Sequence, residues 1–129
     1  MLPAAHRLTE STEFQRVTRQ GRRAGSRTLV AHWDQPAGTA GTAGTGSTLP
    51  AAVGFAVSKQ VGGSVVRNRV KRRLRHAVRE RLAGLPGDGR LVVRALPAAA
   101  AASYQELGAD LDRCLERVLR QQAEQRAPR

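Results

Sequence analysis

The stretch VRNRVKRRLRHAVRERL, residues 66–82, combines a helical spacing of apolar side chains with a high density of positive charge. At about 100° per residue, its apolar side chains share an arc of about 160° on one side of a helix. They are Val66, Val70, Leu74, Ala77, Val78 and Leu82. On the opposite side lie Asn68, Arg69, Arg72, Arg75, His76 and Arg79. The pattern predicts an amphipathic helix whose apolar side packs on the protein's own sheet.

The polar side of this predicted helix is almost purely cationic. Between Arg67 and Arg81 eight residues are basic, and only Glu80 is acidic. Basic side chains one turn apart, such as Lys71 and Arg75, repel each other. Phosphate groups would relieve that repulsion and would release condensed counterions. We therefore interpret the helix as RNA-binding.

Three other interpretations of the helix are weaker. An ordinary solvated face mixes both signs of charge, and a membrane-surface helix would set Trp, Phe or Leu opposite its arginines. DNA binding is disfavoured because no helix-turn-helix, zinc-finger or zipper pattern surrounds the stretch. RNA, recognised by its backbone and shape, is the better partner.

The composition of the whole chain agrees with a polyanionic partner. The 129 residues, 40% of them hydrophobic, suit a single domain over residues 1–129, and 22 basic against 10 acidic residues give a net charge of +12. The single cysteine, Cys114, allows no intramolecular disulfide. No apolar run is long enough for a membrane span, and the start MLPAAHRLTES does not resemble a signal peptide. We expect a cytoplasmic protein with no membrane partner.

The remaining elements are expected in the order helix, strand, strand, helix, strand, helix. A short helix is predicted over Thr9–Gln20, and Ser64 is a candidate cap for the basic helix after the Gly62-Gly63 break. The expected strands are Arg27–Trp33, Ala52–Ser58 and Leu91–Ala95. A Ser-x-x-Glu capping box at 103–106 opens a last helix, whose apolar face includes Cys114. This order predicts an α+β fold, a small α-β sandwich.

Two segments are expected to stay outside the packed structure. The tract Pro36–Pro50 repeats the triplet AGT three times and cannot bury apolar surface. We expect it to be a flexible loop, over 36–50, joining the first two strands as a paired hairpin. A short disordered tail is expected at about 122–129.

No residues group into a protein-borne active site or a metal site. The three histidines, His6, His32 and His76, have no metal-ligand spacing, and Cys114 reads as a buried thiol. No phosphate-binding glycine loop, nucleophile elbow or convergent carboxylate pair is present. We predict no catalytic residue and no metal ligand in the protein.

Several of these segments together resemble the protein subunit of bacterial ribonuclease P. The resemblance is carried by the strand Val53–Ser58 with Lys59 and Gly62, and by VVRNRVKRRLR from Val65 to Arg75, which contains an Arg-Asn-Arg motif. Arg7-Leu8, Glu13-Phe14, Arg27, the strand from Leu91 before Pro97 and the last helix also match. The resemblance covers about residues 6 to 120.

The resemblance implies a fold and a set of partners. The implied fold is an α-β sandwich of the ribosomal protein S5 domain 2-like kind, with a left-handed βαβ crossover, which is rare. The implied partners are the catalytic RNA of ribonuclease P, one protein per RNA, and the 5′ leader of precursor tRNA. The RNA would carry out the hydrolysis with Mg²⁺, and the protein would position the substrate and reduce the repulsion between two RNAs.

The resemblance also assigns roles to individual residues. Contact with the catalytic RNA is implied for Arg67, Asn68, Arg69, Lys71, Arg72, Arg75 and Arg79. The leader cleft or its rim is implied for Phe14, Arg16, Arg27 and Lys59. Thr18, Leu29 and His32 stand where the family often has aromatic residues, so base stacking should be weaker, with Trp33 as a possible replacement.

Some of these roles have structural alternatives. The helical angle of Arg67 falls within the apolar arc, so it either reaches RNA or braces the Gly62-Gly63 turn. Phe14 is either a stacking platform or a core aromatic, and Lys59 is either bound or solvated. At the level of the whole protein, the alternatives are a ribosomal or other structural RNA-binding protein, and an autonomous nuclease, for which no catalytic constellation is present.

Overall fold

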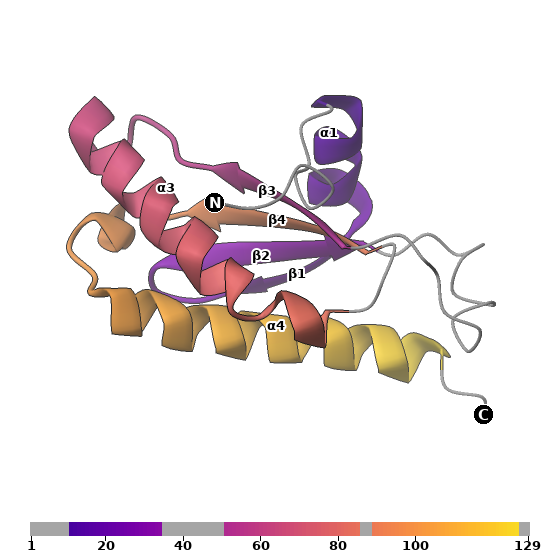
Figure 1. Ribbon diagram of the computed structural model, residues 1–129. Helices are drawn as coiled ribbons and strands as arrows, with labels where there is room; N and C mark the ends of the chain where they lie inside the picture. Colours follow the sequence, from indigo (N-terminus) through magenta and orange to yellow (C-terminus); the bar gives the residue numbers. More distant parts are fainter. Residues whose placement is uncertain (1–10, 35–50, 86–88, 127–129) are drawn as a thin grey trace.

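The computed structural model describes residues 11–34, 51–85 and 89–126, and at 11–14, 20 and 123–126 it describes the backbone alone. Figure 1 shows a mixed sheet with helices on both of its faces. The helices are α1 (Ser11–Gln20), α3 (Ser64–Arg79) and α4 (Tyr104–Arg126), with short 3₁₀ turns η3 (Leu82–Gly84) and η4 (Pro97–Ala100). The strands are β1 (Arg22–Gly25), β2 (Leu29–Asp34), β3 (Ala52–Ala56) and β4 (Arg90–Ala95). The predicted α+β class is confirmed.

The order of strands across the sheet is β1-β2-β4-β3. The β1–β2 and β2–β4 pairs are antiparallel, whereas β3 and β4 are parallel and are joined through α3. In Figure 1 both of these strands run leftward, α3 lies in front of them and β4 lies below β3, which makes the crossover left-handed. This is the handedness that the family resemblance implied and that general packing preferences oppose.

The predicted hairpin between the first two strands is wrong. Strands β2 and β3 are separated by β4, which pairs with both of them. The sequence of β4 explains its central place, because Leu91, Val92 and Val93 are all fully buried and so need cover on both faces of the sheet. The predicted loop 36–50, which was expected to close that hairpin, lies outside the described residues.

Strand β1 was not predicted at all. Its sequence, RRAG, has no β-branched or aromatic residue, so local propensity gives no signal. The strand forms because its backbone pairs with β2 along four registered positions, with Arg23 opposite His32. Ala24 is the residue of β1 that enters the main core.

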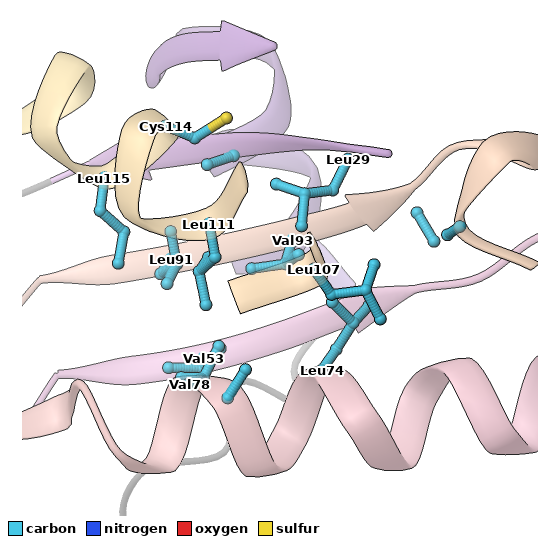
Figure 2. Close-up of a cluster of buried hydrophobic side chains, with 14 of the residues drawn as sticks. Leu29, Val53, Leu74, Val78, Leu91, Val93, Leu107, Leu111, Cys114 and Leu115 are labelled. Carbon is cyan, nitrogen blue, oxygen red and sulfur yellow. The ribbon is translucent and has the colours of Figure 1, made fainter. Parts of the chain in front are cut away.

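Alternate residues of the strands serve two cores. Leu91 and Val93 of β4 point toward α3 and α4, where they join Leu74 of α3 and Leu111 of α4 (Figure 2). Val92, between them, points to the other face and packs with Val17 of α1 and Ala52 of β3. Helix α1 therefore covers one face of the sheet, and α3 and α4 cover the other.

The ends of the two long helices differ in how they are capped. The capping box before α4 is confirmed: the Glu106 backbone N–H donates to Ser103 Oγ at 3.1 Å, and the Ser103 N–H donates to Glu106 Oε1 at 3.0 Å. The N-cap of α3 is Gly63 instead of the expected Ser64, and no side chain caps it. Helix α4 continues to Arg126, so the expected start of a tail at about residue 122 is too early. Gln122 is buried, and its Oε1 accepts the Trp33 indole N–H at 2.7 Å, which satisfies both polar groups.

Candidate nucleic-acid interface

Helix α3 presents one side to the core and the other to the surroundings. Val70, Leu74, Ala77 and Val78 are completely buried, as the helical spacing predicted. Burying them on the α4 side of the sheet fixes the rotation of the helix, so the remaining side chains lie on its flanks or on its outward side. The outward side has no acidic residue in its first turn.

A surface hollow of about 410 Å³ lies on this outward side. It is lined by Asn68, Lys71, Arg72, Arg75 and His76. Four of these residues belong to the predicted RNA-binding set, and the helix brings them together because they are three, four or seven positions apart. His76 was placed on the cationic side by its helical angle but was not included in the predicted site.

Lys71, Arg72 and Arg75 of this hollow have no acidic partner in the part of the chain whose side chains are described. Each carboxylate of the described side chains is engaged elsewhere: Asp34 with Arg16, Glu80 with Tyr104 and His76, Glu106 with Arg27, Asp110 with Thr28 and Arg113, Asp112 with Arg81, and Glu116 with Arg120. Among the described residues, none forms an ion pair or hydrogen bond with the side chains of Lys71, Arg72 or Arg75. Within the described side chains nothing neutralises this multiply charged concave surface, and an external anion would relieve its repulsion.

Other arginines of the same stretch hold the fold together. Arg69 donates to the Ala100 carbonyl at 3.2 Å, and Arg73 donates to the Ala102 carbonyl at 3.0 Å. Arg81 binds both carboxylate oxygens of Asp112, at 2.5 and 3.1 Å, which raises the pKa of its guanidinium. Arg69 is thus on the flank of α3 toward η4, beside the hollow and not in it.

Arg67 differs from both groups. Its side chain is half-buried, and its Nε is buried without a hydrogen-bond partner. The described residues give no support to the bracing alternative, since no side-chain bond links Arg67 to the Gly62-Gly63 turn. A buried donor without an acceptor is costly, and a phosphate oxygen would satisfy it.

Glu80, the one acid of the basic stretch, closes the C-terminal end of α3 against α4. It accepts the hydroxyl of Tyr104 and lies 3.3 Å from His76 Nε2, and the rings of His76 and Tyr104 meet edge to face with centroids 5.5 Å apart. Burial and the bond to Glu80 raise the pKa of Tyr104. The single negative charge of the stretch therefore lies at the His76 end of the hollow, in contact with His76 and Tyr104.

Of the four residues predicted for the leader cleft, the three whose side chains are described make separate contacts. Arg16 of α1 pairs with Asp34 on the α1 side of the sheet, and the exposed Lys59 lines a separate hollow of about 680 Å³ that also includes Arg94. Arg27 pairs with Glu106 at 2.6 Å, at the start of α4. The side chain of Phe14 lies outside the described residues.

Trp33 does not replace the missing cleft aromatics. It is fully buried in the main core and bonded to Gln122 of α4, so it faces away from α1. Its neighbour His32 points to the α1 side, where the strand register places Arg23 opposite it and Arg94 diagonal to it. These three residues were not predicted as a group. The alternation along β2 and β4 could have indicated their common face, but the strand order was needed to join them.

Neither a metal cluster nor a membrane span is found in the described ranges. No three His, Cys, Asp or Glu side chains within residues 11–34, 51–85 and 89–126 are grouped so that they could hold a metal ion. In the same ranges, no helix has both the length and the apolar character needed to cross a bilayer. Cys114 is buried, as predicted, and its burial raises the pKa of the thiol.

The sequence is similar to a known family of proteins along nearly its whole length. The sequence model of the family described as Ribonuclease P matches residues 2–119. The chain is 52% identical to the Ribonuclease P protein component of Nocardioides sp. (strain ATCC BAA-499 / JS614) over 120 residues, which cover 92% of this chain and 95% of the relative. It is 50% identical to the corresponding protein of Salinispora tropica, covering 100% of this chain and 96% of the relative.

Solved structures agree on the fold. A Staphylococcus aureus RNase P protein mutant superposes with a TM-score of 0.73 at 22% identity, covering 87% of this chain and 86% of that one. The Thermotoga maritima RNase P protein superposes with a TM-score of 0.70 at 18% identity, covering 87% and 99%. At these identities the structures support the architecture of the sheet and helices alone.

Proposed function

The chain belongs to the ribonuclease P protein family, and we propose that the outward hollow of α3 is where it binds the catalytic RNA of that ribonucleoprotein. As a protein subunit of ribonuclease P, it serves the endonucleolytic removal of the 5′ leader from precursor tRNA. Its RNA partners are therefore the ribonuclease P RNA and precursor tRNA. Family membership favours this function over the ribosomal-protein and autonomous-nuclease alternatives.

One observation supports the proposal for α3: a concave surface of cations that pair with none of the described side chains, on a helix whose apolar side is buried. Lys71, Arg72 and Arg75 form its centre, with Asn68 as a neutral donor and acceptor. Guanidinium groups bind phosphate oxygens in pairs, so the hollow suits an RNA backbone better than a single small anion. Arg67 and Arg79 extend the contact at either end, and Arg69 joins it from the flank.

In this proposal the protein binds and positions the RNAs, and the RNA subunit carries out the hydrolysis. The carboxylates of the described side chains do not fit a Mg²⁺ site of their own, because each is engaged by an arginine, a histidine or a hydroxyl. Magnesium would then be held mainly by the RNA subunit, where it supplies the hydrolytic chemistry. The cationic protein reduces the repulsion between catalytic RNA and substrate RNA.

The leader of precursor tRNA is proposed to bind on the opposite face of the sheet, near α1. Phe14, Arg16 and Lys59 belong to this part of the proposal, whereas the pairing of Arg27 with α4 leaves Arg27 outside it. The same proposal includes one protein per catalytic RNA, no DNA partner and a location in the cytoplasm, where precursor tRNA is made.

Reconstitution tests the proposal directly. The protein, added to its cognate catalytic RNA at low Mg²⁺, should restore cleavage of precursor tRNA. The variant Arg75→Gln should need a higher protein concentration for the same rate, because it removes a phosphate-binding group. Arg120→Gln is the matched control, since it removes another exposed helical arginine, one that already pairs with Glu116. If added wild-type protein left turnover unchanged, the proposed function would be wrong.

A further inference from the structure

His76 is the one residue lining the hollow on α3 whose charge depends on pH near neutrality. Its side chain is 64% exposed and lies beside Arg72 and Arg75, which stay charged at every physiological pH. The predicted RNA-binding set did not include it. Because an imidazole titrates between about pH 5 and pH 8, the hollow contains a cation that a proton can add or remove.

The His76 ring is held in place by one residue of α3 and one of α4. Its Nε2 lies 3.3 Å from Glu80 Oε1, one helical turn further along α3. The Tyr104 hydroxyl donates to the same oxygen, and the Tyr104 ring meets the imidazole edge to face. Burial and the bond to Glu80 raise the pKa of Tyr104, so the hydroxyl remains a donor at neutral pH. Because the ring is already oriented, a ligand loses less conformational entropy in binding to it.

The contact with Glu80 leaves the other ring nitrogen of His76, Nδ1, for a ligand in the hollow. With Nε2 directed at a carboxylate, a neutral ring carries its proton on Nε2, and Nδ1 is an acceptor. An acceptor cannot bond to a phosphate, whose oxygens also only accept. A ring protonated on both nitrogens donates from Nδ1 to a phosphate oxygen while Nε2 still donates to Glu80. A phosphate contact at His76 therefore needs one additional proton.

The charges around His76 decide when the ring takes up this proton. The cations within five positions of it on the chain are Lys71, Arg72, Arg73, Arg75, Arg79 and Arg81. They oppose a positive charge on the ring, although Asp112 neutralises Arg81. Glu80 favours the charge, and Tyr104 faces the ring from α4 as a neutral group. Bound phosphates would neutralise the cations and attract the charged ring, so the protonated form is favoured more in the complex than in the free protein.

We propose that His76 is a further phosphate-binding residue of the hollow and takes up one proton from the solvent when the catalytic RNA binds. The proton adds to Nδ1, which then donates a charge-assisted hydrogen bond to a phosphate oxygen. Glu80 and Tyr104 position the ring for that contact. The affinity for the catalytic RNA therefore increases as the pH falls through the range in which imidazole titrates. This inference rests on the proposed binding of the catalytic RNA to α3 and makes that binding dependent on pH.

The test measures the dissociation constant of the full-length protein and its cognate catalytic RNA between about pH 8 and pH 6, at one salt concentration. Over this range the affinity of the wild type should increase by roughly two- to fivefold more than that of His76→Gln, the effect of one exposed charge pair. Glutamine keeps a donor and an acceptor but does not titrate. His6 and His32 remain in both proteins, so the difference belongs to His76. Calorimetry in buffers of different ionisation enthalpy should show more proton uptake on binding by the wild type than by the variant.

Two further variants separate the charge from the contact that holds the ring. His76→Lys carries a permanent charge, so it should bind more tightly than His76→Gln at pH 8 and should lack the additional pH dependence. Glu80→Gln removes one of the two anions that favour the protonated ring, so the increase in affinity should move to lower pH.

The outcomes separate this inference from the function on which it rests. If the wild type and His76→Gln show the same pH dependence and the same proton uptake, the inference is wrong, although binding of the catalytic RNA stands. If His76→Lys binds no more tightly than His76→Gln at pH 8, a charge at this position contacts no phosphate, which also overturns it. Should His76→Gln fail to fold, the proton uptake of the wild type against that of His76→Lys decides the matter. If the wild type shows no salt-dependent affinity for the catalytic RNA at any pH, the proposed function itself fails.

Discussion

At the scale of single residues, the arginines of the basic stretch divide according to what accepts their hydrogen bonds. Arg81 is committed to Asp112 of α4 and to the Ala77 carbonyl, at 2.7 Å. Arg72 and Arg75 lie in the outward hollow without a described acceptor. Side chains of the same type therefore stabilise the fold in one place and, in the proposed function, bind phosphate in another.

This division predicts opposite effects for two substitutions. Arg81→Met should lower the free energy of unfolding by about 1 kcal/mol, because Asp112 and the Ala77 carbonyl lose their donor while the partly exposed ion pair is screened by solvent. Affinity for the catalytic RNA should change little. Arg75→Gln should leave the free energy of unfolding unchanged and weaken RNA binding. Urea denaturation and RNA titration of both variants check this, and a loss of stability in Arg75→Gln would contradict the division.

His32 predicts a pH dependence of stability. Its pKa in the folded protein is below the usual 6.5, so the unfolded chain binds the proton more readily. Stability should therefore be complete above about pH 6.5 and should fall as the pH decreases below it, before the carboxylates titrate. Arg23 and Arg94 raise the cost of protonation, and Asp34, which Arg16 neutralises, offsets little of it. In His32→Phe the decrease between pH 6.5 and pH 5 should disappear; thermal unfolding across that range measures it, and an identical pH profile in both proteins would refute it.

At the scale of elements, the local sequence was sufficient to predict the helices, whose hydrogen bonds and caps join residues three or four positions apart. The spacing of Val70 and Leu74 gave the buried side of α3, and Ser103 with Glu106 gave the start of α4. The local sequence was not sufficient to predict every strand or the strand order, because pairing with a partner strand decides both. Strand β1 has no propensity of its own, and nothing in β2 or β3 reveals that β4 lies between them. The left-handed crossover could be expected only from the family resemblance.

The two helix starts offer a matched pair of serines. Ser103→Ala should lower the free energy of unfolding by about 1 kcal/mol, because its hydroxyl accepts a backbone N–H at the first turn of α4. Ser64→Ala should have no comparable effect, since Gly63 is the cap of α3 and no side chain caps that helix. Chemical denaturation of both variants measures the difference. Equal losses of stability would mean that the hydroxyl bond to Glu106 contributes nothing.

At the scale of the whole molecule, the sheet separates the hollow on α3 from the face that α1 covers. Helix α3 turns its hollow away from one face of the sheet, and Arg23, His32 and Arg94 lie on the other face. In the proposed function, this protein of net charge +12 binds the catalytic RNA on the α3 side and the leader of precursor tRNA on the α1 side. The hollow on α3 was largely foreseen because helical angles group its residues. The α1 side was not, because its residues come from three strands whose order the sequence does not disclose.

The salt dependence of catalytic-RNA binding tests the central claim most directly. The logarithm of the affinity should fall linearly with the logarithm of the salt concentration, and Arg75→Gln should reduce that slope by about 1, the contribution of one phosphate contact. Arg120→Gln, whose arginine pairs with Glu116 on the far end of α4, should retain the wild-type slope. If both variants lowered the slope equally, the RNA would be responding to overall charge. The hollow on α3 would then not be its binding site.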